Sequence, residues 1–362
     1  MRAPAQAAGR PTGTTDRGPV VLVTGATGFL GTSLVRRLLS RAQQVRVLVR
    51  SKAKAKEMAN RGADVIVGEI ADQSAVAAAV DGVGIVYHLA GRLLRPDVPA
   101  REYERTHVEG TRVLLDACMR LSSITRFVHC STTGVLGVTG EWPADENAPM
   151  RPTNVYETTK AKAELAVRDA IADGFPAVIA RPGLVYGPGD LHLLPFFHAV
   201  LRHRFRPIGS HPVWLHPIYI DDLSEGLLHC GYHPAAPGEC FHLAGRVPVS
   251  LDELAAAIAR AGGTRVPYGH IPILAASVVA TLGDALPAKL RRSVPLTRSR
   301  LDFLTHSRVY DVTKAERVLD LAASTDFGTG AAMTVAWYRS EGYLPARADQ
   351  HAVADQQALV HG

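Results

Sequence analysis

The chain has 362 residues, 47% of them hydrophobic and 20% charged, which is ample for one large domain with a buried core and a smaller second one. The formal charge is +6, but lysines and arginines are spread along the chain, so the composition offers no basic stripe for nucleic acid. The most apolar run, residues 271–282, is too short to span a bilayer, which needs about 20 residues.

The four cysteines form no Cys-x-x-Cys pair, so we expect buried thiols in a reducing compartment. None of the fifteen histidines lies in a metal-binding spacing such as His-Glu-x-x-His, so no metal is expected. Residues 1–18 are rich in Ala, Pro, Gly and Thr without the apolar centre of a signal peptide. We predict a cytoplasmic protein with disordered segments over 1–18 and 346–362.

Short runs of Val, Ile and Leu alternate with helical stretches through the first half of the chain. Buried strands are predicted at residues 20–23, 45–49, 65–67, 85–88, 127–130 and 177–179. Helices are predicted between them at residues 32–41, 52–61, 73–80, 104–121 and 155–173. Uninterrupted apolar strands separated by amphipathic helices are typical of a parallel sheet covered on both faces, so we predict a doubly wound Rossmann α/β fold.

The pattern changes after residue 183, where loops rich in Pro, His and aromatic residues alternate with short elements. Two capping boxes, beginning at Ser250 and Thr313, predict helix starts, and Gly262 predicts the end of the first of these helices. We therefore predict a dinucleotide-binding domain over 19–183 and a smaller, mixed substrate-binding region over 184–345. That region should lie over the carboxyl ends of the strands, where such sheets bind ligands.

A glycine-rich segment, Thr24-Gly-Ala-Thr-Gly-Phe-Leu-Gly31, follows the first strand and opens the first helix. Its glycines allow a tight turn and a close approach of the backbone to a pyrophosphate at the helix N-terminus. Dinucleotide binding is therefore favoured over a purely structural turn. The residues predicted to contact the nucleotide here are Gly25, Thr27, Gly28, Phe29, Leu30 and Gly31.

Over residues 19–344 the sequence resembles the extended short-chain dehydrogenase/reductases of the NAD-dependent epimerase/dehydratase superfamily. Besides the glycine-rich segment, motifs occur in the family's order: Tyr87-His-Leu-Ala-Gly91, Val108-Glu-Gly-Thr111, Ser131-Thr-Thr133, Tyr156-Glu-Thr-Thr-Lys160, Arg181-Pro-Gly183, Val185-Tyr-Gly-Pro188 and Ile220-Asp-Asp222. Within the family the chain looks most like the branch of 3β-hydroxysteroid dehydrogenases and dihydroflavonol reductases. The resemblance implies an oxidoreductase that uses a nicotinamide dinucleotide.

Tyr156 and Lys160 lie one helical turn apart and share a face, and a nearby ammonium should lower the pKa of the tyrosine. We therefore predict that Tyr156 is a general acid/base. By the resemblance, Thr132 hydrogen-bonds the reacting oxygen and Lys160 also holds the nicotinamide ribose hydroxyls. A second Tyr-x-x-x-Lys match, Tyr310 to Lys314, is predicted to be structural because it is placed at a helix start far beyond the sheet.

The end of the second strand indicates the choice of cofactor. NAD-binding relatives usually carry an acidic residue there, whereas this chain has Arg50, whose guanidinium suits a 2′-phosphate. We predict NADP, with NAD as the alternative if Arg50 only stacks on the adenine. His107 stands where the family usually has an Asn that organises the helix and a proton path. The further cofactor contacts implied by the resemblance are Glu69, Ile70, Leu89, Ala90, Gly91, Pro182, Gly183 and Val185, together with Tyr156 and Lys160.

Two branches of the family compete for the substrate. In the segment 208–222, the place of the Arg that clamps a nucleotide diphosphate in nucleotide-sugar enzymes is taken by Leu215, next to Trp214. We therefore predict interconversion of a secondary alcohol and a ketone on a lipophilic steroid-, flavonoid- or polyketide-like molecule. A nucleotide-sugar epimerase or dehydratase is the alternative, and a non-catalytic cofactor-binding scaffold is a further one. The predicted substrate contacts are Arg92, Thr133, Leu194, Phe197, Trp214 and Leu215; Phe197 and Trp214 are equally compatible with an ordinary core.

The helices predicted at 104–121 and 155–173 carry more apolar residues than one sheet face needs. Relatives pair these two helices in a four-helix contact between subunits. We therefore predict a homodimer that acts on a small molecule.

Overall fold

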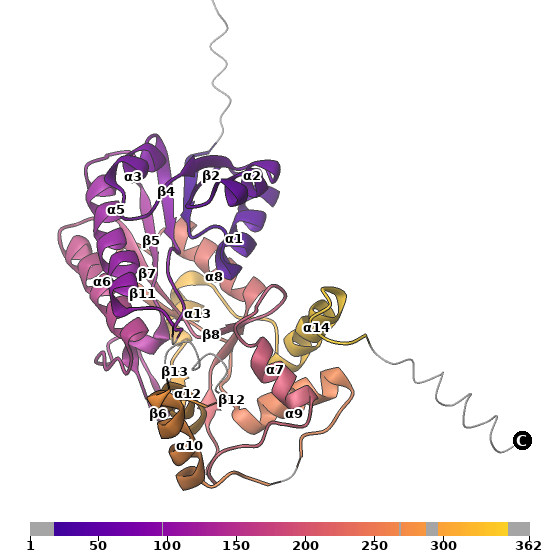
Figure 1. The fold of residues 1–362 in the computed structure, drawn as a ribbon. Helices are drawn as coiled ribbons and strands as arrows, with labels where there is room; N and C mark the ends of the chain where they lie inside the picture. The colour runs from indigo at the N-terminus through magenta and orange to yellow at the C-terminus, as the bar shows by residue number, and fades with distance from the viewer. Residues whose placement is uncertain (1–17, 96, 268, 287–295, 347–362) are drawn as a thin grey trace, which may run out of the picture.

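The computed structural model describes residues 18–95, 97–267, 269–286 and 296–346, so both predicted disordered segments lie essentially outside the described residues. A seven-stranded sheet in the order β11-β7-β5-β4-β1-β2-β3 forms its centre, and all neighbouring strands are parallel (Figure 1). The strands are β1 (Val20–Thr24), β2 (Val45–Val49), β3 (Asp64–Val67), β4 (Val83–His88), β5 (Arg126–Cys130), β7 (Ala177–Pro182) and β11 (Cys240–Leu243). The predicted Rossmann fold is confirmed.

Helices cover both faces of this sheet, as its uninterrupted apolar strands require. One core cluster joins the sheet to α1 (Phe29–Ser40) and α8 (Ile220–Tyr232). The other joins it to α3 (Gln73–Val80), α5 (Gly110–Met119) and α6 (Val155–Ala172). The strand order reverses between β1 and β4, and the carboxyl ends of strands at such a point are where doubly wound sheets bind ligands.

The helix predicted over 104–121 is not regular. It consists of α4 (Ala100–Tyr103), a π-helical turn over Glu104–Glu109 and then α5. Single π-helical turns inside helices occur frequently at functional sites. Here the turn carries His107, the residue that replaces the family's Asn.

The smaller region is built from short strand pairs and helices beside the sheet (Figure 1). The pairs are β8 (Leu184–Tyr186) with β10 (Pro217–Tyr219), β9 (Trp214–Leu215) with β12 (Val249–Ser250), and β6 (Gly140–Ala144) with β13 (Arg308–Tyr310). The helices are α7 (Leu194–Leu201), α9 (Leu251–Gly262), α10 (Ile273–Ala285), α12 (Arg298–Thr305), α13 (Thr313–Leu319) and α14 (Phe327–Ser340). The remaining helix, α2 (Lys52–Asn60), connects β2 and β3 of the large sheet. Within residues 184–345, α8 and β11 return to the large sheet, and the other elements form the smaller region.

Of the two predicted capping boxes, only the first forms. Ser250 and Glu253 exchange both bonds of a capping box, and the helix ends one residue later than predicted, at Gly263 with a φ of 78°. The box at Thr313 is wrong, since the backbone N–H and the hydroxyl of Thr313 both donate to Asp311, at 2.9 and 2.7 Å. Asp311 thus holds the residue that was expected to cap.

The four cysteines are free and buried, as expected for small apolar residues. Within the described ranges of the chain, no helix is both long and apolar enough to cross a membrane.

Candidate active site

The glycine-rich turn after β1 packs so tightly that side chains are excluded from it. Gly25 has a φ of 69°, and a Cβ there would overlap the carbonyl of Leu89. A Cβ at Gly31 would likewise overlap the carbonyl oxygen of Gly25. The turn therefore leaves bare backbone at the N-terminus of α1, which is the arrangement that a pyrophosphate needs.

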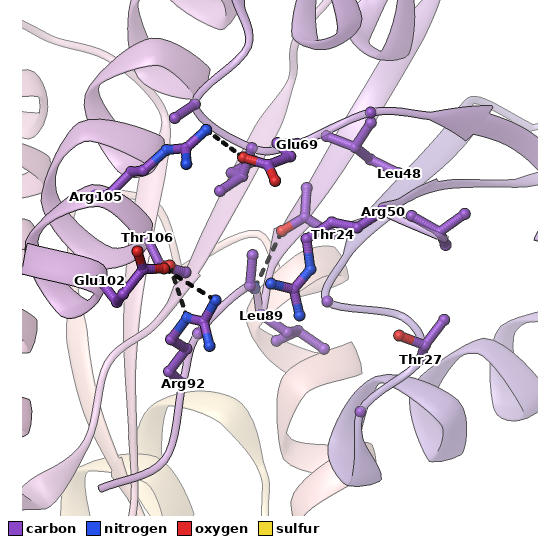
Figure 2. Close-up of a pocket in the computed structure, with 18 residues that line it drawn as sticks. Thr24, Thr27, Leu48, Arg50, Glu69, Leu89, Arg92, Glu102, Arg105 and Thr106 are labelled. Carbon is purple, nitrogen blue, oxygen red and sulfur yellow. Dashed lines mark hydrogen bonds and ion pairs between the residues drawn. The ribbon is translucent and has the colours of Figure 1, made fainter. Parts of the chain in front are cut away.

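A cavity of about 310 Å³ lies at this turn, at the carboxyl ends of β1, β2, β3 and β4 (Figure 2). Its lining includes nine of the residues predicted to bind the cofactor: Gly25, Thr27, Gly28, Arg50, Glu69, Ile70, Leu89, Ala90 and Gly91. The sequence analysis missed Thr24, Leu48, Val49, Gly68, Ala71, Glu102, Arg105 and Thr106, which also line it. The lining residues at the ends of β1, β2 and β3 could have been found from the predicted strand positions. Nothing in the sequence indicated the three residues on the helical segment 100–109, which are Glu102, Arg105 and Thr106. A bare-backbone cradle opening into this cavity fits a dinucleotide.

The other predicted cofactor residues lie outside this lining. Phe29 and Leu30, in the first turn of α1, pack against a cluster formed by Tyr186, Tyr219 and Ile220. Pro182, Gly183 and Val185 lie at the end of β7 and in β8, beyond the neighbouring strand β5. The cavity therefore collects the residues expected around the adenosine and pyrophosphate half of the cofactor.

Charged side chains surround the cavity (Figure 2). Arg105 forms an ion pair with Glu69, and Arg92 forms one with Glu102 at 3.2 Å. Arg50 lies exposed just after β2, and among the described residues no carboxylate pairs with it. Its guanidinium is therefore available to an anionic ligand.

Thr132, Tyr156 and Lys160 meet at the carboxyl end of β5. Thr132 follows this strand and caps a short 3₁₀ turn by accepting a hydrogen bond from the Gly134 N–H at 3.1 Å. Tyr156 lies in the first turn of α6, and its hydroxyl interacts with the side chain of Thr132. Lys160, one turn further on, is buried, and its ammonium donates a hydrogen bond of 2.5 Å to the carbonyl of Cys130.

The neighbouring hydroxyls are engaged elsewhere, which distinguishes Thr132 from them. Ser131 donates to the buried carboxylate of Glu164 at 2.6 Å, and Thr133 donates to the carbonyl of Pro182 at 3.1 Å. Thr132 is the half-buried member of the three and the one that faces Tyr156.

Burial dominates the electrostatics of this group. Desolvation raises the pKa of Tyr156, and the hydrogen bond with Thr132 only partly opposes this rise. Desolvation also lowers the pKa of Lys160. The expectation that Lys160 lowers the pKa of Tyr156 is therefore wrong for this state of the site, since the ammonium is directed at the Cys130 carbonyl. Tyr156 is accordingly held as a neutral hydroxyl, the form that donates a proton.

His107 joins the nucleotide cavity to helix α6, which carries Tyr156 and Lys160. Its Nε2 accepts a hydrogen bond from the Arg92 N–H at 2.9 Å, so the proton of the neutral ring is on Nδ1, which donates to the Thr159 hydroxyl at 2.8 Å. The ring meets Tyr156 edge-on at 5.6 Å between centroids. Burial lowers the pKa of His107 to about 3, so the ring is neutral at physiological pH.

The six predicted substrate contacts are not gathered in one place. Arg92 lines the cofactor cavity, and Thr133 lies buried beside Thr132. Phe197 and Leu215 are packed inside the C-terminal core, with Leu194 half-buried against it. Trp214 is half-buried on β9, and its backbone N–H donates to the Ser307 hydroxyl at 3.0 Å. Phe197 therefore fits the alternative interpretation as a core residue, and Leu215 is packed in the same core.

The second Tyr-x-x-x-Lys match does not form a catalytic pair. Tyr310 is not at a helix start but on β13, where it is buried, interacts with Thr133 and stacks on His216. Lys314 forms an ion pair with Glu239 at 2.7 Å. The expected position of this match needs one correction, because Tyr310 lies on a strand and interacts with Thr133, the neighbour of Thr132.

A glycine cradle at the switch point of a parallel sheet, with Thr132, Tyr156 and Lys160 at the next strand end, defines an α/β enzyme that binds a nicotinamide dinucleotide. The family model for the "NAD dependent epimerase/dehydratase family" matches residues 21–244, and the protein belongs to this family.

The relatives include named oxidoreductases. The chain is 30% identical to the 4-hydroxy-2-methyl-3-oxo-4-farnesyl-3,4-dihydroquinoline-1-oxide ketoreductase of Stigmatella aurantiaca, over 90% of this chain and 99% of the relative. It is also 30% identical to a 3 beta-hydroxysteroid dehydrogenase/Delta 5-->4-isomerase of Mycobacterium tuberculosis, over 89% of this chain and 90% of the relative. Among solved structures, that of gox2253 has a TM-score of 0.75 at 26% identity and covers 90% of this chain and 99% of its own. The protein is an NAD(P)-dependent oxidoreductase of the extended short-chain type.

Proposed function

We propose that this protein interconverts a secondary alcohol and a ketone on a lipophilic small molecule, with Tyr156 as the general acid/base. The observation that carries the proposal is the meeting of Thr132, Tyr156 and Lys160 at the end of β5, one strand from the glycine cradle. In the reducing direction, a nicotinamide dinucleotide held at the glycine cradle would supply a hydride to the carbonyl carbon. Tyr156 gives its hydroxyl proton to the carbonyl oxygen, and Thr132 donates a hydrogen bond to that oxygen. Solvent then returns the proton to the resulting tyrosinate, and Lys160 holds the nicotinamide ribose hydroxyls.

The apolar substrate class rests on two points. Leu215 takes the place of a diphosphate-binding Arg and is packed in the core, so this position offers no charge to a nucleotide sugar. The two relatives above are named for a farnesylated quinoline oxide and a hydroxysteroid, which are both lipophilic.

We infer NADP as the preferred cofactor. Arg50 is exposed at the cavity and pairs with no carboxylate among the described residues. Its guanidinium can donate hydrogen bonds to a 2′-phosphate. The Glu69 carboxylate, which could otherwise bind a ribose diol, forms an ion pair with Arg105.

We also propose a homodimer formed through α5 and α6. Each of the two helices exposes one large apolar side chain. Met119 on α5 is 45% exposed, and Leu165 on α6 is 51% exposed. A dimeric mass in light scattering that Leu165→Asp reduces to the monomer supports this contact; a monomeric parent protein refutes it.

The test of the activity follows nicotinamide absorbance with NADPH and a panel of keto-steroids, flavonoid ketones and long-chain ketones. Tyr156→Phe should reduce turnover by about 10²-fold or more, the scale of a lost general acid, while cofactor binding is kept. Tyr338→Phe is the matched control, because this buried tyrosine has no hydrogen-bond partner among the described residues. Full activity of Tyr156→Phe would refute the assignment, and micromolar binding of UDP-glucose with no turnover of any apolar ketone would favour the nucleotide-sugar alternative.

A further inference from the structure

A normal surface helix buries its large apolar side chains and exposes its polar ones, and helix α10 does not follow this rule. Its buried residues are small: Ala276, Ala280 and Gly283. Its large apolar residues are exposed, with Leu274 at 79%, Val278 at 60% and Leu282 at 65%. These three are spaced four residues apart and form one stripe on the outer face, which we call the α10 stripe.

The helix also has no polar group that requires water on this face. The one charged residue of α10, Asp284, lies in its last turn and forms an ion pair with Arg298 at 4.0 Å. The only hydroxyls in α10, those of Ser277 and Thr281, donate back to the carbonyls of Ile273 and Ser277, both at 2.8 Å. Contiguous exposed apolar surface of this kind marks an interaction site.

The size of the stripe argues against a second copy of the chain as its occupant. A stable dimer buries about 800 Å² on each partner and uses some 20–30 residues a side. The α10 stripe belongs to one helix of 13 residues. A helix lying in the surface of a bilayer needs only one apolar face.

The charges that follow α10 in the sequence indicate which surface it meets. Residues 284–300 contain five lysines and arginines and one carboxylate, that of Asp284. Arg298, at the start of α12, lies at the end of α10. Its backbone N–H donates to Asp284 at 3.2 Å, and its side chain, which is 70% exposed, forms an ion pair of 4.0 Å with the same carboxylate. Cations beside an apolar helix are attracted by anionic headgroups.

We propose that α10 docks this protein on the surface of an anionic lipid bilayer. Figure 1 shows α10 at the lower end of the molecule and the strands and helices around the nucleotide cavity toward the other end, so docking leaves the cavity open to solvent. The proposal depends on the surface alone and stands whether or not the substrate is lipophilic.

Sedimentation of the full chain with vesicles is the first experiment. The protein should sediment with vesicles of equimolar phosphatidylcholine and phosphatidylglycerol, and at least tenfold less with phosphatidylcholine alone. The double variant Leu274→Asp with Leu282→Asp should lose at least tenfold of the binding to mixed vesicles. Met333→Asp, an exposed apolar position on α14, is the matched control and should bind as the parent does.

A labelled variant keeps the proposal testable even if the double variant misfolds. All four native cysteines are buried, so Leu274→Cys can be labelled selectively with an environment-sensitive fluorophore. The label at 274 should brighten severalfold on mixed vesicles, whereas a label at Met333→Cys should not change. No sedimentation of the parent with mixed vesicles, or an unchanged signal at 274, overturns the proposal. A dimeric mass in light scattering that the double variant abolishes, without vesicle binding by the parent, assigns the stripe to a second copy instead.

Discussion

His107 offers a sharp test of how the site is held together, because its two ring nitrogens have different partners. Nε2 accepts from the Arg92 N–H, and Nδ1 donates to Thr159. The side-chain amide of Gln reaches about as far as Nε2, and that of Asn about as far as Nδ1. His107→Gln should therefore keep the bond to Arg92, and His107→Asn should keep the bond to Thr159 while losing the other. His107→Phe loses both.

The magnitudes follow from what each variant leaves without a partner. A buried N–H that loses its acceptor costs about 1–3 kcal/mol, and the Arg92 N–H is only partly buried, so we expect about 1 kcal/mol for Asn. Thr159 keeps its hydrogen bond to the Val155 carbonyl at 2.9 Å, so Gln should cost less. Because Arg92 lines the cofactor cavity, His107→Asn and His107→Phe should also weaken cofactor binding by about fivefold, the equivalent of 1 kcal/mol.

Chemical denaturation and cofactor titration of the three variants measure both effects. The free energy of unfolding should decrease in the order parent, His107→Gln, His107→Asn, His107→Phe. Cofactor binding should be weaker in the Asn and Phe variants only. Equal behaviour of Gln and Asn would show that the imidazole does not bridge Arg92 and Thr159. A fully stable Phe variant would show that His107 only fills space.

Three further predictions follow from charges and caps. Arg50→Asp should weaken NADPH binding at least tenfold, since one charge-assisted phosphate contact contributes about 1.5–3 kcal/mol; equal NADPH and NADH affinities of the parent in titration calorimetry would argue against this. Ser250→Ala should cost about 1 kcal/mol in denaturation and Thr313→Ala less, because only Ser250 forms a capping box. Burial lowers the pKa of His88 to about 3 and that of His242 to about 4, so both are neutral when folded. The unfolded chain takes up these protons, so the free energy of unfolding should fall as the pH is lowered from 6 to 5, by up to about 1.4 kcal/mol per pH unit for each histidine; a flat profile would contradict the burial of neutral rings.

The nucleotide-binding part was predictable from the sequence because its signals are local. Alternating apolar strands and helices determine the sheet, and the glycines of the first turn determine where a pyrophosphate can approach. Arg105 and Thr106 were missed because they reach the cavity from a π-helical turn, which rotates side chains away from the positions that a regular helix gives them.

The substrate-facing part was less predictable because burial there depends on contacts between distant segments. Leu215 and Phe197 have the composition of a pocket lining, but both are packed in a core formed with α9 and α14. Apolar residues in a loop-rich region are compatible with either role, and only the packing of several short elements decides between them.

The two Tyr-x-x-x-Lys segments show why a spacing alone does not define chemistry. On α6 the spacing puts Tyr156 and Lys160 on one face of one helix, and that face is turned to the end of β5. In the second segment the tyrosine ends strand β13 and the lysine lies in α13, so the same spacing directs the two side chains to different partners. Tyr310 nevertheless reaches the active site, through Thr133. Tyr310→Phe should therefore lower turnover only modestly and leave the tyrosine-dependent proton transfer in place, which the pH dependence of turnover measures; a loss as large as that of Tyr156→Phe would reverse the assignment of the two tyrosines.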